Sequence, residues 1–223
     1  MNHRRLQQWH KASKLFFISI AFLGRSIFTF GQVAIVPVRM NVLYIGVDNP
    51  VSVDALGGRD DNITVSVSGG EGVVSKVVTD LYNVRVSSIT DECWIKVSVN
   101  GKWVGSSSFR VRNLPVPLAA IGGFDSGDTI TADRFRIQAS VGAYLKDFPF
   151  QVKYEVLGFT FNLNDQRGTA KSTDCQGALF SAQAKEYIDQ YLKPGTTVTI
   201  TNIRTKDPGG KELKVAPLIY YVD

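Results

Sequence analysis

The sequence predicts an all-β (mainly β) protein made of two small β-sandwich domains in tandem, with one short helix in the second domain. Three observations lead to this prediction. Apolar and polar residues alternate in short runs, as they do in strands that bury one face. Gly, Asn, Asp and Ser clusters separate these runs at short intervals. Two prolines in three residues, Pro115 and Pro117, divide the pattern into two halves.

The length of 223 residues suits one or two domains. The prolines near residue 115 end a strand and stiffen the chain that follows, because proline fixes φ and restricts its neighbour. We therefore expect four parts: an N-terminal segment at 1–31, a first domain at 33–114, a linker at 115–118 and a second domain at 119–223.

The first domain is expected to hold about six strands with short connections. The clearest is 63–68, where Ile, Val and Val alternate with Thr, Ser and Ser. Asn100-Gly101 between two alternating runs predicts a type I′ hairpin, because both positions need positive φ. This pattern is typical of a small antiparallel sandwich. The expected strands span 40–47, 63–68, 73–78, 81–88, 93–99 and 102–111.

The second domain shows weaker alternation and one helical pattern. Residues 181–193 place apolar side chains on one helix face, with Ser181 suited to cap the start and Pro194-Gly195 to end it. Gly158 inside a strand pattern predicts a bulge. The expected strands span 129–143, 150–163, 196–205 and 211–222.

The charge distribution argues against a nucleic-acid partner. The formal net charge is +5, but residues 1–32 carry five basic residues and no acidic one. The remainder holds 20 basic and 20 acidic residues, so it is neutral. A neutral body gains little from counterion release on DNA or RNA, and we expect no such binding.

The N-terminal segment is typical of a secretory signal. A basic head precedes the apolar run 15–24, and Thr29 and Gly31 supply small residues for cleavage before Gln32. The apolar run is shorter than the roughly 20 residues that span a bilayer. We expect export to the periplasm by a cleaved signal peptide. The alternative is an uncleaved anchor that continues through Arg25 to Phe30 and holds the protein on the inner membrane, facing the periplasm.

The sequence contains no recognisable catalytic constellation. Both histidines, His3 and His10, lie near the N-terminus, so the body has no histidine to activate a serine or cysteine nucleophile. Zinc binding also needs more His and Cys ligands than the body offers. We expect a protein that is not an enzyme, with no catalytic, cofactor or metal site and no small-molecule substrate.

Two other patterns could indicate a bound ligand but have simpler explanations. Gly69, Gly70 and Gly72 follow a strand, but Ser75 replaces the third glycine of a dinucleotide fingerprint, so we expect a hairpin turn. The segment 162–168 has part of a calcium-loop alternation without a later acid. The acidic groups are expected at turns, and two carboxylates across a cleft stay an open alternative. These groups are Asp60-Asp61, Asp91-Glu92 and Asp125 with Asp128.

Cysteine and tryptophan positions leave two further alternatives. Cys93 and Cys175 are expected as isolated buried thiols, with a bridge between them as the alternative. Trp94 and Trp103 flank the Asn-Gly hairpin. Burial is the expectation for tryptophan in a sandwich, whereas exposed side chains would suit a sugar or a partner. Tyr220-Tyr221 is expected as one inward and one outward residue of a strand.

Three segments carry a family resemblance. The segment VPVRMNVLYIGVDNP at 36–50 resembles the opening of the penultimate domain of the GldM/PorM family, the gliding-motility and type IX secretion proteins of Bacteroidota. FRVRNLPVP at 109–117 resembles the strand and linker between the last two domains of that family. TNIR at 201–204, followed by DPGGKEL, resembles the final domain.

The resemblance covers 36–223 and implies two Ig-like domains in the periplasm. In that family an inner-membrane dimer couples a motor partner, GldL, to the GldK/GldN ring, and the last domains reach the ring. The expected function is therefore a non-catalytic scaffold that docks on the secretion or gliding assembly. Expected partners are envelope proteins such as GldK/GldN-like ring components, and a homodimer would fit the family. The alternative is an envelope carbohydrate- or surface-binding module. The resemblance transfers no binding residue, and these are left unknown.

Overall fold

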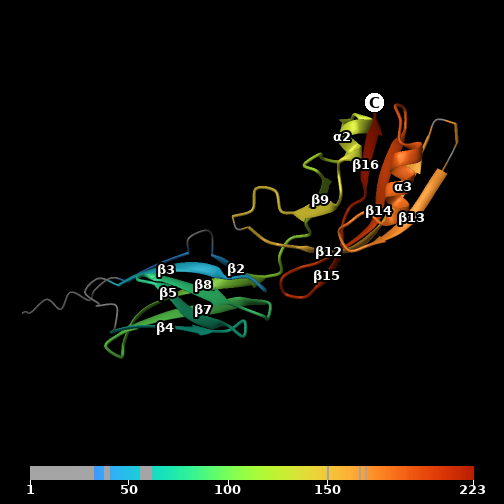
Figure 1. Ribbon diagram of the computed structural model, residues 1–223. Helices are drawn as coiled ribbons and strands as arrows, with labels where there is room; N and C mark the ends of the chain where they lie inside the picture. Colours follow the sequence, from blue (N-terminus) through green and yellow to red (C-terminus); the bar gives the residue numbers. More distant parts are fainter. Residues whose placement is uncertain (1–32, 38–40, 56–61, 150, 166, 169) are drawn as a thin grey trace, which may run out of the picture. The chain divides into compact units, whose positions relative to one another are not determined.

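The computed structural model describes residues 33–37, 41–55, 62–149, 151–165, 167–168 and 170–223 (Figure 1). Within these residues the protein is mainly β, as the sequence predicts, with strands β1 to β16 and two helices, α2 and α3. The expected signal peptide at 1–31 and the acidic pair Asp60-Asp61 lie outside the described residues. No helix in the described part is long and apolar enough to cross a membrane.

Two four-stranded sheets form the first sandwich. One sheet has the order β1-β3-β6-β5 and the other β2-β8-β7-β4. The strands of the first sheet are β1 (Val33–Pro37), β3 (Asn49–Ala55), β6 (Leu81–Arg85) and β5 (Val73–Val78). The strands of the second are β2 (Val42–Tyr44), β8 (Lys102–Arg112), β7 (Thr90–Val99) and β4 (Ile63–Ser68).

The core of this sandwich follows from the alternation of its strands. In β7, Cys93, Ile95 and Val97 are buried, whereas Trp94 and Lys96 between them are exposed. The facing sheet contributes buried residues of β3 and β6 to the same cluster. The two-residue alternation of apolar and polar residues therefore predicts correctly which side chains of β7 face the core and which face the solvent.

Two expectations about this sandwich were wrong. The described residues contain eight strands rather than six, and β2 pairs with β8 in parallel, so the sandwich is not wholly antiparallel. The expected strand at 40–47 is cut short because the buried side chain of Asn49 folds the chain back. Its amide accepts from the Tyr44 N–H at 2.7 Å and donates to the carbonyls of Tyr44, Val47 and Val84.

The turns of this sandwich show what local sequence can and cannot predict. Asn100 and Gly101 have φ of 51° and 74°, which confirms the hairpin between β7 and β8. The Gly-rich segment at 69–72 is a turn, but the expected hairpin was wrong. It joins β4 to β5, which belong to different sheets, so it is an arch across the sandwich. Whether a turn forms a hairpin or an arch depends on which strands pair with each other, and these strands are remote in sequence.

The second half of the chain forms a six-stranded sheet, a small two-stranded sheet and two helices. The large sheet has the order β10-β16-β14-β12-β13, with β15 paired to β14, and β9 pairs with β11 in the small sheet. The large sheet comprises β10 (Thr129–Ile130), β16 (Leu218–Val222), β14 (Thr197–Lys206), β12 (Glu155–Asn164), β13 (Ala170–Gln176) and β15 (Glu212–Lys214). The other elements are β9 (Leu118–Ile121), β11 (Val141–Tyr144), α2 (Ala132–Arg136) and α3 (Ala182–Tyr191).

An aromatic cluster occupies the core of this half. The ring of Phe180 lies 5.6 Å from that of Phe161 and 5.8 Å from that of Phe159, both edge to face. Phe135 of α2 and Tyr220 of β16 extend the cluster. Such rings favour offset or edge-to-face packing and bury large apolar areas. Since this core and that of the first sandwich are separate clusters, each half buries its own residues.

Helix α3 confirms the helical pattern found in the sequence. The Ser181 hydroxyl accepts from the N–H of Ala184, and the helix runs to Tyr191. Ala184 and Ile188 point into the core. Figure 1 shows α3 lying against the sheet beside β13, in agreement with its contacts to β12 and β13.

The expected bounds of three strands in this half were wrong. The segment 129–143 contains β10, the five-residue helix α2 and β11, because Thr131 caps a helix that buries Phe135. The expected strand 150–163 begins only at Glu155. The expected strand 211–222 is split into β15 and β16, with Pro217 between them, since proline cannot donate to the ladder. Gly158 lies where the β12–β14 register shifts, as predicted.

Candidate binding sites

The outer face of the β4–β7–β8 sheet brings the two tryptophans together. Residues that pair across neighbouring strands point to the same face of the sheet. The pairing of β4, β7 and β8 therefore places the side chains of this face in three rows. The rows are Thr64–Ser98–Trp103, Ser66–Lys96–Ser106 and Ser68–Trp94–Ser108. Trp94 and Trp103 therefore lie on the same face, two rows apart, with polar side chains between them.

Both tryptophans face the solvent, and the expectation of burial was wrong. Trp94 is 39% exposed and Trp103 is 68% exposed. The alternation of β7 buries Cys93 and Ile95, which directs Trp94 outward. A register shift after Val97 pairs Ser98 with Trp103, so the bulge in β8 sets the face on which Trp103 emerges. Sequence spacing alone did not decide this.

This face is basic as well as aromatic. Lys96 and Arg110 are exposed on it, whereas Lys102 pairs with Val99 and so belongs to the other face at the hairpin end. Neither β4, nor 93–99, nor β8 contains an acidic residue. Neither Lys96 nor Arg110 has an ion pair among the described residues, but Asp91, which binds Arg112, also interacts electrostatically with Arg110. In the described chain, Lys96 is thus a basic side chain at the centre of this face without a charged partner.

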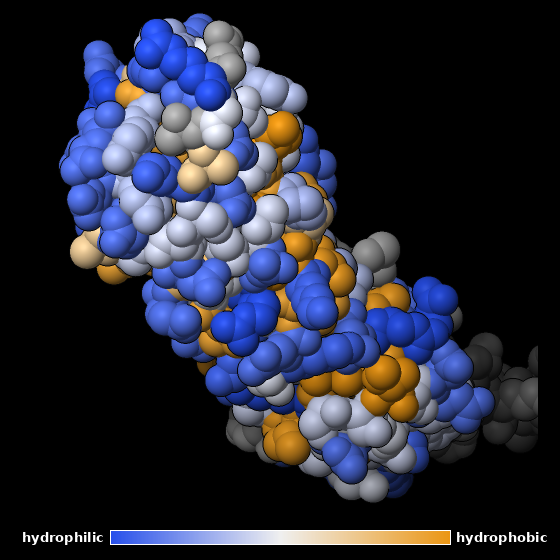
Figure 2. All heavy atoms as spheres, turned by 90° about the vertical axis from the view of Figure 1, so that its right-hand side faces the viewer, coloured by the Kyte–Doolittle hydropathy of each residue, from blue (hydrophilic) through white to orange (hydrophobic). Residues whose placement is uncertain are grey.

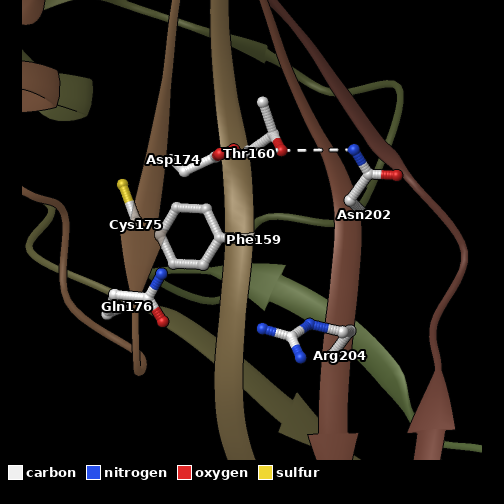
Figure 3. Close-up of a pocket in the computed structure, with 7 residues that line it drawn as sticks. All are labelled: Phe159, Thr160, Asp174, Cys175, Gln176, Asn202 and Arg204. Atoms are coloured by element: carbon white, nitrogen blue, oxygen red, sulfur yellow. Dashed lines mark hydrogen bonds between the residues drawn. The ribbon is translucent and has the colours of Figure 1, made fainter.

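A small polar pocket lies over β12, β13 and β14 (Figure 3). Its volume is about 220 Å³, and its lining is Phe159, Thr160, Asp174, Cys175, Gln176, Asn202 and Arg204. Gly158 pairs with Gln176 on one side and with Arg204 on the other. These two side chains point toward each other across β12 in Figure 3. Their position follows directly from the register of the three strands.

Gly158 keeps the floor of this pocket free. A Cβ atom at this position would lie 2.9 Å from the carbonyl oxygen of Cys175 and 3.4 Å from Nη2 of Arg204. It would also lie 3.8 Å from Oε1 of Gln176. The absence of a side chain therefore lets the guanidinium and the amide approach the backbone of β12.

One wall of the pocket is an ordered chain of hydrogen bonds. Asn202 donates to the hydroxyl of Thr160 at 3.2 Å, and Thr160 donates to Oδ1 of Asp174 at 2.7 Å. Asn202 has a φ of 52°, a left-handed conformation that asparagine tolerates better than most residues. It occupies a bulge in β14, and such bulges re-aim side chains.

The pocket retains unused hydrogen-bonding groups. Among the described residues, neither the Arg204 guanidinium nor the Gln176 amide makes a side-chain hydrogen bond or ion pair, and both are exposed. Asp174 accepts only from Thr160 there. The site thus offers donors and acceptors in a space smaller than the roughly 300–1,000 Å³ of typical ligand pockets. It has the size to receive one side chain of a partner.

Sequence reasoning missed the residues of this pocket. The only signal was Gly158, which was correctly read as a bulge but not as a pocket floor. Gln176, Asn202 and Arg204 are ordinary polar residues in sequence. Their convergence depends on the order of three strands and on two register shifts, which a single sequence does not specify.

The predicted acidic groups have structural partners. The Asp125 carboxylate accepts from the hydroxyl of Tyr144 at 2.8 Å, and Asp128 accepts from the N–H of Asp125 within a turn. Asp91 binds Arg112, and the hydrogen bond lowers the pKa of Asp91. Asp91 and Glu92 lie inside β7 at a register shift, not at the expected turn. No group of three His, Cys, Asp or Glu in the described chain could hold a metal ion.

The cysteines and terminal tyrosines behave as predicted. Cys93 and Cys175 are buried and unbridged, each in its own core. Burial raises the pKa of the Cys93 thiol. Tyr220 is fully buried and Tyr221 is 47% exposed. On the molecular face drawn in Figure 2, hydrophobic residues form patches interspersed with hydrophilic ones.

The sequence was compared with known families. It matches the GldM third domain over residues 32–112 and the GldM C-terminal domain over residues 115–223. The two matches are consecutive and together cover nearly all of the described chain. No curated protein matches the sequence.

Three solved structures show a low similarity to the chain. The Yersinia pseudotuberculosis adhesin InvE is 12% identical with a TM-score of 0.29, and the match covers 84% of this chain and 58% of the adhesin. Fibronectin(III)-like modules of Clostridium thermocellum CbhA are 12% identical with a TM-score of 0.27, covering 86% and 93%. Domains 6–7 of surface layer protein SbsC are 10% identical with a TM-score of 0.29, covering 86% and 98%.

Proposed function

The chain belongs to the GldM family, and from this membership we propose that it is a non-catalytic, protein-binding scaffold module of the periplasm. It docks on the type IX secretion or gliding-motility assembly. The observation that carries the proposal is the consecutive match of two GldM domains over 32–112 and 115–223. Two separate hydrophobic cores support a first domain at 33–114 and a second at 119–223, joined by a linker at 115–118.

The pocket over Gly158 is the contact point that we assign to this docking. Its volume of about 220 Å³ suits one side chain rather than a substrate with a leaving group. Arg204 and Gln176 have donors to spare, and Asp174 has a free acceptor. A polar side chain of a partner protein would satisfy both kinds of group at once.

Rigid surroundings make this pocket suitable for recognition. The pocket sits on three paired strands rather than on loops, so its side chains start from fixed backbone positions. Thr160 and Asn202 hold Asp174 through the hydrogen-bond chain. Less conformational freedom is therefore lost when a partner binds, and a guanidinium is among the groups that most often dominate binding energy at interfaces.

Ring components that resemble GldK and GldN are the partners we propose. A homodimer, which would double the number of docking sites, forms part of the same proposal. The test is cross-linked affinity purification of the tagged full chain from envelope fractions, followed by mass spectrometry. The proposal requires enrichment of GldK/GldN-like proteins. A list without any secretion or gliding component would refute it.

Two charge-reversal variants connect the test to the pocket. Arg204→Glu should remove most of the captured ring proteins, because it replaces the guanidinium with a second carboxylate in the pocket that Asp174 also lines. Arg167→Glu changes the charge equally at an exposed position that does not line the pocket and should leave capture unchanged. Equal loss in both variants would show a general charge effect and exclude the pocket as contact point. Unchanged capture in both would place the docking surface elsewhere.

A further inference from the structure

A second binding surface follows from the outer face of the β4–β7–β8 sheet, independently of the proposed docking function. Trp94 and Trp103 share this face, and both are exposed. We propose that this face binds an acidic polysaccharide. The two indole rings are platforms for sugar rings, and basic residues attract the carboxylates of the chain.

The spacing of the tryptophans indicates an extended ligand. Trp103 pairs with Ser98, which lies four residues from Trp94 along β7. At about 3.3 Å per residue and about 4.8 Å between strands, the two positions are roughly 14 Å apart. A single small molecule does not reach both rings, whereas a chain of several sugar units does. The aromatic rings offer apolar faces for the C–H face of a sugar.

The residues between the tryptophans suit a hydroxylated ligand better than a protein. Thr64, Ser66, Ser98 and Ser106 occupy the rows around Lys96. Protein interfaces usually have an apolar, aromatic-rich centre and a polar rim. This face has the reverse arrangement, with its apolar groups at two ends and hydroxyl groups in the middle. Hydroxyl groups donate and accept, as the hydroxyls of a polysaccharide do.

Charge complementarity selects an acidic chain. Lys96 stands in the middle row between the tryptophans, and Arg110 lies on the same face, two residues beyond Ser108 of the Trp94 row. Neither Lys96 nor Arg110 has an ion pair in the described chain, and β4, residues 93–99 and β8 lack acidic residues. The acidic residues of β7 are Asp91 and Glu92 at its start, where the charge of Arg110 helps to lower the pKa of Asp91. Regularly spaced carboxylates on an extended ligand would neutralise Lys96 and Arg110.

Single-stranded nucleic acid is the competing ligand, since its bases also stack on tryptophan. Among the described residues, this face carries two basic side chains without an ion pair, Lys96 and Arg110, which allows few phosphate contacts and little counterion release. Binding of single-stranded nucleic acid depends on basic and aromatic residues, so it gives the rows of hydroxyl groups no role. The observations therefore favour the polysaccharide, and an oligonucleotide serves as one arm of the test.

The test measures binding of oligoalginate to the full chain by isothermal titration calorimetry and tryptophan fluorescence. Cello-oligosaccharide of equal length is the neutral probe, and a thymidine oligonucleotide is the nucleic-acid probe. We expect oligoalginate to bind at least about tenfold more tightly than either, a difference of about 1.4 kcal/mol. Tighter binding of the oligonucleotide, equal binding of the neutral chain, or no binding of oligoalginate would overturn the proposal.

Variants locate the site. Trp94→Ala and Trp103→Ala should each weaken oligoalginate binding by about tenfold. Lys96→Gln should weaken it less and reduce its dependence on salt, because one ion contact is lost. Tyr221→Ala and Lys211→Gln are controls at exposed positions of the other half and should bind normally. Unchanged binding in both tryptophan variants would refute the site.

Different variants test the polysaccharide site and the docking pocket. Trp94→Ala and Trp103→Ala leave the pocket over Gly158 intact, so they should still capture ring proteins. Arg204→Glu leaves the tryptophan face intact and should still bind oligoalginate. Because both tryptophans are exposed, the variants should also keep the melting temperature of the unaltered protein.

Discussion

The guanidinium of Arg204 lies over Gly158, close enough that a Cβ atom at 158 would be 3.4 Å from its Nη2. The same Cβ atom would be 2.9 Å from the carbonyl oxygen of Cys175, a backbone atom that cannot turn away. This glycine therefore serves packing rather than backbone conformation. It lets two neighbouring strands and one arginine approach a third strand closely.

Replacing Gly158 with alanine should destabilise the protein. The added methyl group forces β12 and β13 apart, and overpacking of this kind typically costs about 1–3 kcal/mol. Gly142→Ala in β11 is the matched control, since its Cβ would meet nothing closer than 3.8 Å. The control should be neutral or slightly stabilising, because alanine restricts the unfolded chain. Urea unfolding of both variants measures the difference, and equal stabilities would contradict the argument.

Tyr220 should make stability fall at alkaline pH. Burial raises the pKa of its phenol to about 12, from about 10 in an unfolded chain. The folded state thus holds the proton more tightly, and its advantage is complete below pH 10 and lost as the pH rises toward 12. Tyr154, whose pKa burial also raises to about 12, adds to the same loss. Urea unfolding at a series of pH values should show this decline.

The hydrogen bonds of Tyr220 give a second readout. Its hydroxyl accepts from the N–H of Ile121 at 3.2 Å and donates to the carbonyl of Phe124 at 3.0 Å. Tyr220→Phe leaves both backbone groups without this partner and should cost about 1–3 kcal/mol. It should also flatten the alkaline decline. Tyr221→Phe, at an exposed site, should do neither; a comparable loss there would contradict the assignment.

The hairpin between β7 and β8 should depend on asparagine at position 100. Its φ of 51° is left-handed, a conformation that costs most residues about 1–2 kcal/mol. Asn100→Ala should therefore lower the free energy of unfolding by about 1 kcal/mol, whereas Asn100→Gly should be nearly neutral. Thermal unfolding of the two variants distinguishes them. Equal stability of both would show that the turn conformation is not what stabilises the hairpin.

The two cysteines should be unreactive in the folded protein. Cys93 and Cys175 are buried in separate cores, and burial raises the pKa of Cys93, which lowers its thiolate fraction. An aromatic disulfide reagent should modify both thiols only after denaturant is added. Reducing agent should leave the melting temperature unchanged, because there is no bridge to break. Rapid modification of the native protein would contradict this burial.

The cap of helix α3 should contribute measurably to stability. Ser181 accepts from the N–H of Ala184 at 3.2 Å, which satisfies one of the free donors at the start of the helix. Ser181→Ala should cost about 1 kcal/mol, and Ser181→Asp should retain most of the stability. Circular dichroism during urea unfolding measures both. If Ser181→Ala were as stable as Ser181→Asp, the cap would not contribute to the stability of the protein.

Much of the local structure could be predicted from sequence because short-range rules determine it. Alternation placed Ile95 and Val97 in the core, and Asn100-Gly101 identified the hairpin. Ser181 and the helical pattern after it located α3. In each case, residues within a few positions of one another supply the deciding interactions, so the signal is contiguous.

The failed predictions share a different cause. The strand at 40–47 stops early because Asn49 bonds to the remote carbonyl of Val84. Helix α2 forms where alternation suggested a strand, because Phe135 packs against Phe180 and Tyr220. Such contacts join residues far apart in sequence, and no local pattern records them.

The sequence by itself determined the mainly β class, the hairpin at Asn100-Gly101, the helix at α3 and the resemblance to GldM. Only the tertiary structure decided that Trp94 and Trp103 share one exposed face and that Arg204 and Gln176 lie on either side of Gly158. The physical reason is register. Side chains of a strand alternate between faces, so a bulge or a shift of one residue moves a side chain to the other side of the sheet. Register is set by pairing between strands, and that pairing exists only in the folded chain.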